Sequence, residues 1–83
     1  MNHNPDNVSL RAYYNEDSDQ PAIVIRETYP ISDDDVEIHL WGRVTKDGEL
    51  KIYQDTMETP LYVFELARLI KKNFTLLYRS LKN

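Results

Sequence analysis

Four stretches in the first two thirds of the chain alternate between apolar and polar residues, which is the pattern of strands that bury one face of a sheet. The alternation predicts strands at about residues 8–14, 22–29, 36–45 and 50–55. Their expected inner face consists of Val8, Leu10, Ile23, Ile25, Val36, Ile38, Leu40, Val44, Leu50 and Ile52. Glu27 falls on the inner side of the second strand and interrupts the alternation, so we expect a bulge or a strand end near it.

A helical pattern fills the last part of the chain. Thr59 can accept a backbone N–H that has no partner, and Pro60 fits the first helical position, where its missing donor costs nothing. Neither glycine nor proline follows, so the pattern predicts one long helix at about residues 60–82. One apolar arc of this helix contains Val63, Leu66, Ala67, Ile70, Phe74, Leu77, Tyr78 and Leu81.

The turn between the third and fourth strands follows from the expected faces. A two-residue turn at Asp47 and Gly48 would set Val44 opposite Lys51 and mix the two faces, because directly opposed residues share a face. A three-residue turn that ends at Gly48, in the left-handed conformation, sets Val44 opposite Leu50 instead. We therefore predict the three-residue turn.

Together these elements predict an α+β fold: a four-stranded antiparallel sheet with one long C-terminal helix packed on one face. Residues 8–83 are expected to form a single domain. Residues 1–7 are polar and lack periodicity, so we expect a flexible N-terminal tail. The connections between the strands are short, as in a sheet whose strands follow one another in order.

The charge of the 83-residue chain is −4, but it is unevenly distributed. Residues 1–58 hold five basic and thirteen acidic side chains, whereas residues 59–83 hold five basic and one acidic. An acidic first part disfavours indiscriminate binding to duplex DNA, whose affinity comes mainly from neutralised phosphates. The distribution leaves room for a local basic patch.

Cysteine is absent, so neither disulfides nor thiolate metal sites hold the fold, and we expect no metal and no other cofactor. The N-terminal segment has neither a basic start nor an apolar run. No stretch reaches the roughly 18 consecutive apolar residues of a membrane-spanning helix. We therefore expect a soluble cytoplasmic protein without membrane contact.

The outer face of the predicted sheet carries three aromatic residues among four cations and a histidine: Arg11, Tyr13, Arg26, His39, Trp41, Arg43, Lys51 and Tyr53. Such a surface suits a protein partner, since aromatic residues and arginine are enriched in binding hot spots. It also suits single-stranded nucleic acid, whose bases stack on aromatic rings while the phosphates meet cations. Solvated cross-strand pairs without a ligand are the third possibility.

Four strands followed by one long helix, with AIVIRETYP as a second strand that bears an arginine, resemble the single-strand-binding transcriptional coactivators of the positive-cofactor-four type. The resemblance implies a dimer joined through the helix and strands that grip DNA. The chain departs from that family in being acidic and in lacking its lysine-rich character.

A further apolar stripe with seven-residue spacing lies just outside the arc of the predicted helix: Tyr62, Leu69 and Leu76. It either widens the face that packs on the sheet or forms a helix-to-helix contact in a homodimer. A homodimer would supplement the small core of a chain of this length. The opposite side of the helix is basic and suits a solvated face.

Two acidic segments remain: Glu16, Asp17 and Asp19, and the run Asp33–Asp35. Neither has the glycine and the distal bidentate acid of a calcium loop. Turn formation and solubility account for both segments, and a partner with a basic surface is the alternative. The first segment and Asp47 are expected at one end of the sheet and the second segment at the other.

Catalysis has little support, since the chain has no cysteine nucleophile and no glycine-rich phosphate loop. Glu37 and His39 share a face at a spacing of two, but an open sheet offers no cleft that excludes water. We therefore expect a small non-enzymatic interaction module, a regulator or inhibitor of another protein, that acts as a homodimer. The alternative is a single-stranded DNA- or RNA-binding protein that uses Arg11, Arg26, Trp41, Arg43 and Tyr53.

Overall fold

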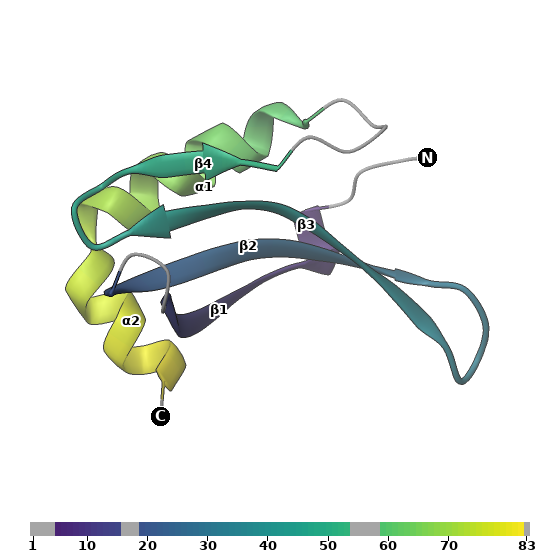
Figure 1. Cartoon of the computed structure of the whole chain (residues 1–83). Coiled ribbons are helices and arrows are strands. Elements are labelled where there is room, and N and C mark those ends of the chain that lie inside the picture. Colours follow the sequence, from purple (N-terminus) through teal and green to yellow (C-terminus); the bar gives the residue numbers. More distant parts are fainter. Residues whose placement is uncertain (1–4, 16–18, 54–58, 83) are drawn as a thin grey trace.

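The chain forms a four-stranded antiparallel sheet in the order β1-β2-β3-β4, followed by two C-terminal helices (Figure 1). This computed structural model describes residues 5–15, 19–53 and 59–82. Its elements are η1 (Pro5–Asn7), β1 (Val8–Asn15), β2 (Gln20–Pro30), β3 (Val36–Thr45), β4 (Leu50–Ile52), α1 (Leu61–Lys72) and α2 (Phe74–Lys82). The predicted α+β class and the antiparallel sheet are confirmed. Residues 1–4 of the predicted tail and 54–55 of the predicted fourth strand lie outside the described residues.

The prediction of one long helix was wrong, because Asn73 separates α1 from α2. Its backbone is not helical (φ −119°, ψ 26°), and its side-chain Nδ2 donates to the carbonyl of Leu69 at 3.1 Å. A short amide side chain that bonds to nearby carbonyls competes with regular helix. The Asn73 carbonyl then accepts from the backbone N–H of Leu77, which starts the next helix. The break lets α2 pack on β1, whereas α1 packs on β2 and β3.

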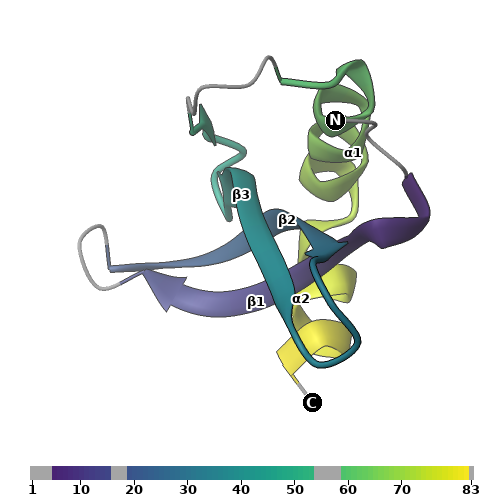
Figure 2. The same cartoon turned by 90° about the vertical axis from the view of Figure 1, so that its right-hand side faces the viewer.

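The core lies between the helices and one face of the sheet. It is built from eight buried side chains: Ile23, Ile25, Trp41, Val44, Val63, Ala67, Ile70 and Phe74. Four of them belong to the predicted apolar arc of the helix, which is buried as expected. In Figure 2, α1 and α2 follow one another along the sheet. The β2–β3 hairpin extends past the helices, and Figure 1 shows this arm leaving the body of the molecule.

The turn between β3 and β4 has the predicted register. Val44 is opposite Leu50, and Gly48 adopts the left-handed conformation with φ 83°. The backbone N–H of Thr45 donates to Glu49 O at 2.9 Å and closes the turn. A three-residue turn with glycine in the left-handed position is therefore confirmed.

β3 contains one residue more than the stretch of β2 that it faces. Ile25 is opposite Gly42 but Arg26 is opposite Leu40, so Trp41 is the extra residue of a β-bulge. The bulge lies next to Glu27, where the interrupted alternation indicated one, but the inserted residue is in the neighbouring strand. Side chains alternate between faces, so one extra residue moves everything before it in β3 to the other face.

The predicted faces of the first half of β3 were wrong for this reason. Val36, Ile38 and Leu40, expected inside, face outward and are 58, 48 and 50% exposed. Trp41, expected on the outer face, is 1% exposed and belongs to the core. His39 also turns inward, opposite Glu27.

Candidate interaction surface

A row of side chains crosses all four strands on the sheet face that the helices leave open. Arg11 is opposite Val24, Val24 is opposite Arg43, and Arg43 is opposite Lys51. Opposed residues share a face, so the three cations of this row lie on the same side of the sheet. Neighbouring strands are about 4.8 Å apart, which makes the row roughly 14 Å long.

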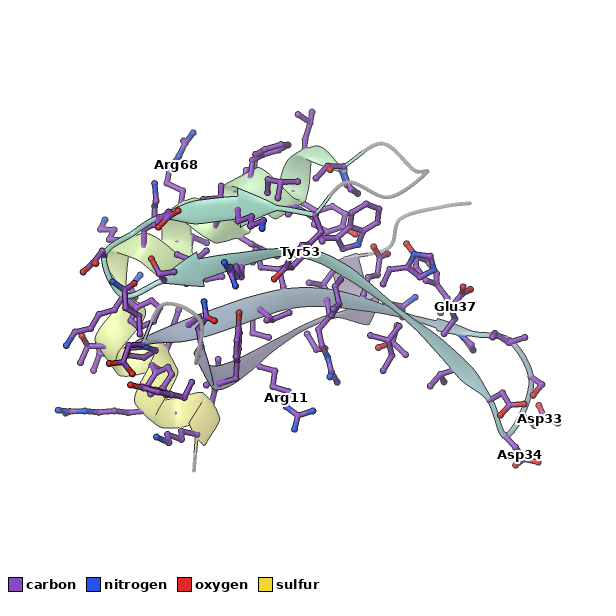
Figure 3. All side chains as sticks on the ribbon, viewed as in Figure 1. Arg11, Asp33, Asp34, Glu37, Tyr53 and Arg68 are labelled. Atoms are coloured by element: carbon purple, nitrogen blue, oxygen red, sulfur yellow. The ribbon has the colours of Figure 1, made fainter. Side chains whose placement is uncertain are left out.

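The sheet forms a hollow of about 490 Å³ around this row. The residues that line the hollow are Arg11, Tyr13, Asn15, Val24, Arg26, Leu40, Arg43 and Tyr53. The hollow thus brings together five of the eight predicted outer-face residues, and among the described residues no acidic side chain lines it. Lys51 is exposed next to Arg43 but outside the lining. Figure 3 labels Arg11 and Tyr53 on this surface, and it shows Arg68 apart from them, on α1.

Arg43 is the centre of a polar cluster in the hollow. Its guanidinium donates a hydrogen bond to the Tyr13 hydroxyl, and this bond is the main cause that raises the pKa of Arg43. Tyr53 interacts with both residues, and burial is the main cause that raises the pKa of its phenol. Arg43 therefore stays charged and Tyr53 stays protonated at neutral pH. The Glu49 carboxylate also raises the pKa of Arg43, but it is a weaker cause than the Tyr13 bond and does not line the hollow.

Arg26 is held beside this cluster. Its Nε donates to Ser9 Oγ at 3.2 Å, and its neighbour on β3 is Leu40. A fixed stem costs less side-chain entropy when the guanidinium binds a ligand. The hollow therefore presents a partly oriented cation next to an apolar side chain.

An exposed apolar strip continues from the hollow along β3. We define the strip as Val36, Ile38 and Leu40, which the bulge turns outward. Leu40 belongs to both the strip and the hollow. The surface is therefore mixed, with arginine and tyrosine at one end and aliphatic side chains at the other.

Trp41 has a structural role on the opposite face. Its Nε1 donates to Glu27 Oε2 at 2.9 Å, and the Tyr62 hydroxyl donates to the same oxygen. Tyr29 also bonds to Glu27, and burial followed by this bond raises the pKa of Tyr29 to about 12. Glu27 is fully buried, so these donors compensate for the lost hydration of its carboxylate. We call Glu27, Tyr29, Trp41 and Tyr62 the carboxylate cluster.

His39 and Glu37 lie together as their spacing predicts, but on the inner side of the sheet. Their Nε2 and Oε1 atoms are 3.4 Å apart. The His39 ring also packs edge-on against Tyr29, with centroids 4.8 Å apart, and stacks on Trp41. These contacts make His39 a neighbour of the carboxylate cluster and separate it from the hollow.

The three residues predicted for a dimer contact have different surroundings. Tyr62 turns inward and belongs to the carboxylate cluster. Leu69 and Leu76 remain 55 and 72% exposed. Leu69 and Tyr62 also line a groove of about 380 Å³ between α1 and β1, together with Val8, Ser9, Leu10, Glu65 and Leu66.

The described residues of the two acidic segments lie at opposite ends of the sheet. Gln20, which follows Asp19, donates from Nε2 to Asp47 Oδ2 at 2.7 Å, so Asp19 and the β3–β4 turn share one end. Residues 16–18 lie outside the described residues. Asp33–Asp35 are exposed at the far tip of the β2–β3 hairpin, where Figure 3 labels Asp33 and Asp34.

No protein-family model matches the chain, and no match was found among curated proteins or among solved structures. The resemblance to the positive-cofactor-four type therefore gains no support from these comparisons. Neither helix in the described part of the chain is long and apolar enough to cross a membrane.

Sequence reasoning missed two features of the surface. Leu40 was assigned to the core, although the interrupted alternation at Glu27 signalled a change of face nearby. Asn15 was left outside the first predicted strand, at about residues 8–14, whereas it ends β1, lines the hollow and is only 4% exposed. Strand alternation alone could have placed Asn15 on the face of Arg11, two positions after Tyr13.

Proposed function

We propose that the protein is a small non-enzymatic interaction module, a regulator or inhibitor of another protein, and that its outer sheet face binds that partner. The observation that supports the proposal is the exposed apolar strip beside the arginine- and tyrosine-lined hollow. A solvated sheet face gains nothing from three half-exposed aliphatic side chains, whereas a contact surface does. Arginine and tyrosine next to such side chains are typical of interface hot spots.

Single-stranded nucleic acid is the second candidate, and the three arginines and two tyrosines of the hollow support it. Trp41 is buried in the core and does not lie on this face. This position weakens the case for nucleic acid, because the face lacks its strongest aromatic platform for stacked bases. Leu40 and Ile38 are present in its place, and aliphatic side chains fit a protein better than a phosphate backbone. The protein partner is therefore the first candidate.

A homodimer remains part of the proposal. The exposed Leu69 and Leu76 support it, since both lie on the helices and leave the outer sheet face free for a partner. The groove beside Leu69 offers further apolar surface that a second copy would bury.

Affinity capture from extract of the cells that make the protein tests the proposal. We expect the wild type and a Leu61→Asp control to retain the same partner, and Leu40→Asp to lose it. Leu61 is 82% exposed on α1, whereas Leu40 lies on the outer face, so both variants add one exposed charge to a folded protein. Retention of every captured protein by Leu40→Asp would refute the proposed face. Tight binding of labelled oligothymidine that Arg43→Ala abolishes would favour nucleic acid instead.

A further inference from the structure

The outer hollow differs in charge from the rest of the molecule. The whole chain carries a net charge of −4, yet three arginines and no acid from the described residues line the hollow. Lys51 extends the positive row by one strand. Glu49 lies within electrostatic range of Arg43 but does not line the hollow. The clustered cations repel one another, so an anionic ligand in the hollow would lower this repulsion.

Asn15 is an independent sign of a missing ligand. Its side chain lines the hollow and is 96% buried, and its Nδ2 has no hydrogen-bond partner among the described residues. A buried amide donor without an acceptor is rare in folded proteins and costs stability. Because Nδ2 itself is buried, the amide would turn toward the hollow to find an acceptor in a carboxylate bound there.

We infer that the hollow binds an acidic, extended segment of the partner protein, in which acidic residues flank an apolar one. This inference rests on the proposed function, since it names the chemistry of the partner at the same face. The arginines and the Asn15 amide receive carboxylates, and Val24 and Leu40 receive the apolar side chain between them.

The spacing of the row supports an extended peptide. Arg11 and Arg43 lie two strands apart, which is roughly 10 Å. An extended chain advances about 3.3 Å per residue and turns every second side chain to the same face, so acids four positions apart, about 13 Å, face the sheet together with the residue midway between them, and the long arginine side chains reach both acids. Val24 lies between them, opposite both, and gives the intervening apolar side chain a contact. A nucleic-acid backbone has no group that would use this contact.

Selection of a phage-displayed random peptide library on the immobilised protein tests the inference. We expect enriched peptides in which acids flank an apolar residue, with affinities that fall as salt rises. The best peptide should bind Arg11→Glu at least about tenfold more weakly, because a like charge then faces its carboxylate. Arg68→Glu makes the same charge change on α1, away from the hollow, and should leave the affinity unchanged.

Asn15→Leu separates ligand binding from folding. This variant removes the unpaired donor, so the free protein should be at least as stable as the wild type while the peptide binds several-fold more weakly. Lower stability of the free variant would show that the amide serves the fold and would remove this support.

Enrichment of neutral or basic peptides, or of none, would overturn the inference, as would equal loss of affinity in Arg11→Glu and Arg68→Glu. If Leu40→Asp still loses a cellular partner in that case, only the class of ligand is wrong and the proposed function stands. If capture also fails, the proposed face is wrong too. If oligothymidine displaces the selected peptides and binds more tightly than they do, the ligand of the hollow is a nucleic acid and not a peptide.

Discussion

The carboxylate cluster should be a main determinant of stability, and Glu27→Leu tests this directly. Leucine has a similar volume but no acceptor, so the indole N–H of Trp41, whose residue is 1% exposed, loses its partner. The hydroxyl of Tyr29, 9% exposed, loses one as well, whereas the half-buried Tyr62 can turn to water. An unsatisfied buried donor costs about 1–3 kcal/mol.

Two such donors lower the free energy of unfolding, and the more favourable burial of leucine than of a carboxylate offsets part of this loss. The expected loss in the free energy of unfolding is about 2–4 kcal/mol. A domain of this length has a free energy of unfolding of roughly 4–12 kcal/mol, so the loss is a large fraction of it. Glu27→Gln keeps an acceptor for Trp41 and should lose about half as much, since hydrogen bonds to an ionised acceptor are about twice as strong as neutral ones.

Guanidinium denaturation followed by the fluorescence of Trp41, the single tryptophan, measures these free energies. The exposed Glu65 provides the matched control: Glu65→Leu should change stability by less than about 0.5 kcal/mol. A double-mutant cycle with Trp41→Phe, followed by circular dichroism because this variant lacks the only tryptophan, should give a coupling energy of about 1–2 kcal/mol. A Glu27→Leu protein within about 0.5 kcal/mol of the wild type would refute the reasoning, because the donors would then be satisfied without the carboxylate.

Three further predictions concern pH, backbone packing and assembly. The pKa of Tyr29 is about 12 in the folded state, against 10.0 for a free phenol. The stability that this group contributes is therefore constant below pH 10 and is lost between pH 10 and 12, because the unfolded chain releases its proton first. Denaturation midpoints across that range should fall less steeply in Tyr29→Phe. Gly42→Ala should destabilise the protein by more than about 1 kcal/mol in thermal unfolding, because an added Cβ would lie 2.9 Å from the Lys51 carbonyl oxygen. The double variant Leu69→Glu with Leu76→Glu should convert a dimer to a monomer in light scattering, and an unchanged mass would remove the homodimer.

The elements and most of the register could be predicted because they depend on local patterns. Alternation located the strands, and the requirement that opposed residues share a face selected the turn with Gly48 in the left-handed conformation. The helix was predicted as continuous because no glycine or proline interrupts it. Asn73 ends α1, and its side chain bonds to a backbone carbonyl. In a sequence, asparagine is a weaker signal of a helix end than proline. Whether the helix breaks there also depends on where the apolar surfaces of the sheet lie.

The candidate site was predicted only in part because its composition depends on one inserted residue. Arg11, Tyr13 and Arg43 lie on segments where alternation is regular, so their face was assigned correctly. Alternation read through Trp41 assigned six positions of β3, Trp41 included, to the wrong sides. Glu27 was a sign in the sequence that the assigned faces were wrong, because a carboxylate on a core face needs hydrogen-bond donors. The indole and the phenols that supply these donors could not be identified from local patterns, because two of them are far from Glu27 along the chain.

The bulge connects the buried cluster with the outer surface, and this connection can be tested. Leu40 faces outward because Trp41 turns inward to Glu27. Weakening that bond should therefore affect binding at a face that neither residue reaches. Trp41→Phe keeps an aromatic ring in the core but removes the donor, so we expect a folded protein whose first half of β3 changes between the two registers.

Hydrogen exchange should then show faster exchange of the β3 amides in Trp41→Phe than in the wild type, and partner capture should decrease together with the protection of this segment. Phe74→Leu provides the control. Phe74 belongs to the same core, stacks on Tyr78, and lies beside Pro21 and Lys46 rather than beside the bulge at Trp41. A Phe74→Leu protein of equal stability should keep its partner. If both variants lose the partner in proportion to their lost stability, the surface depends on general stability and the bulge has no specific role in presenting it.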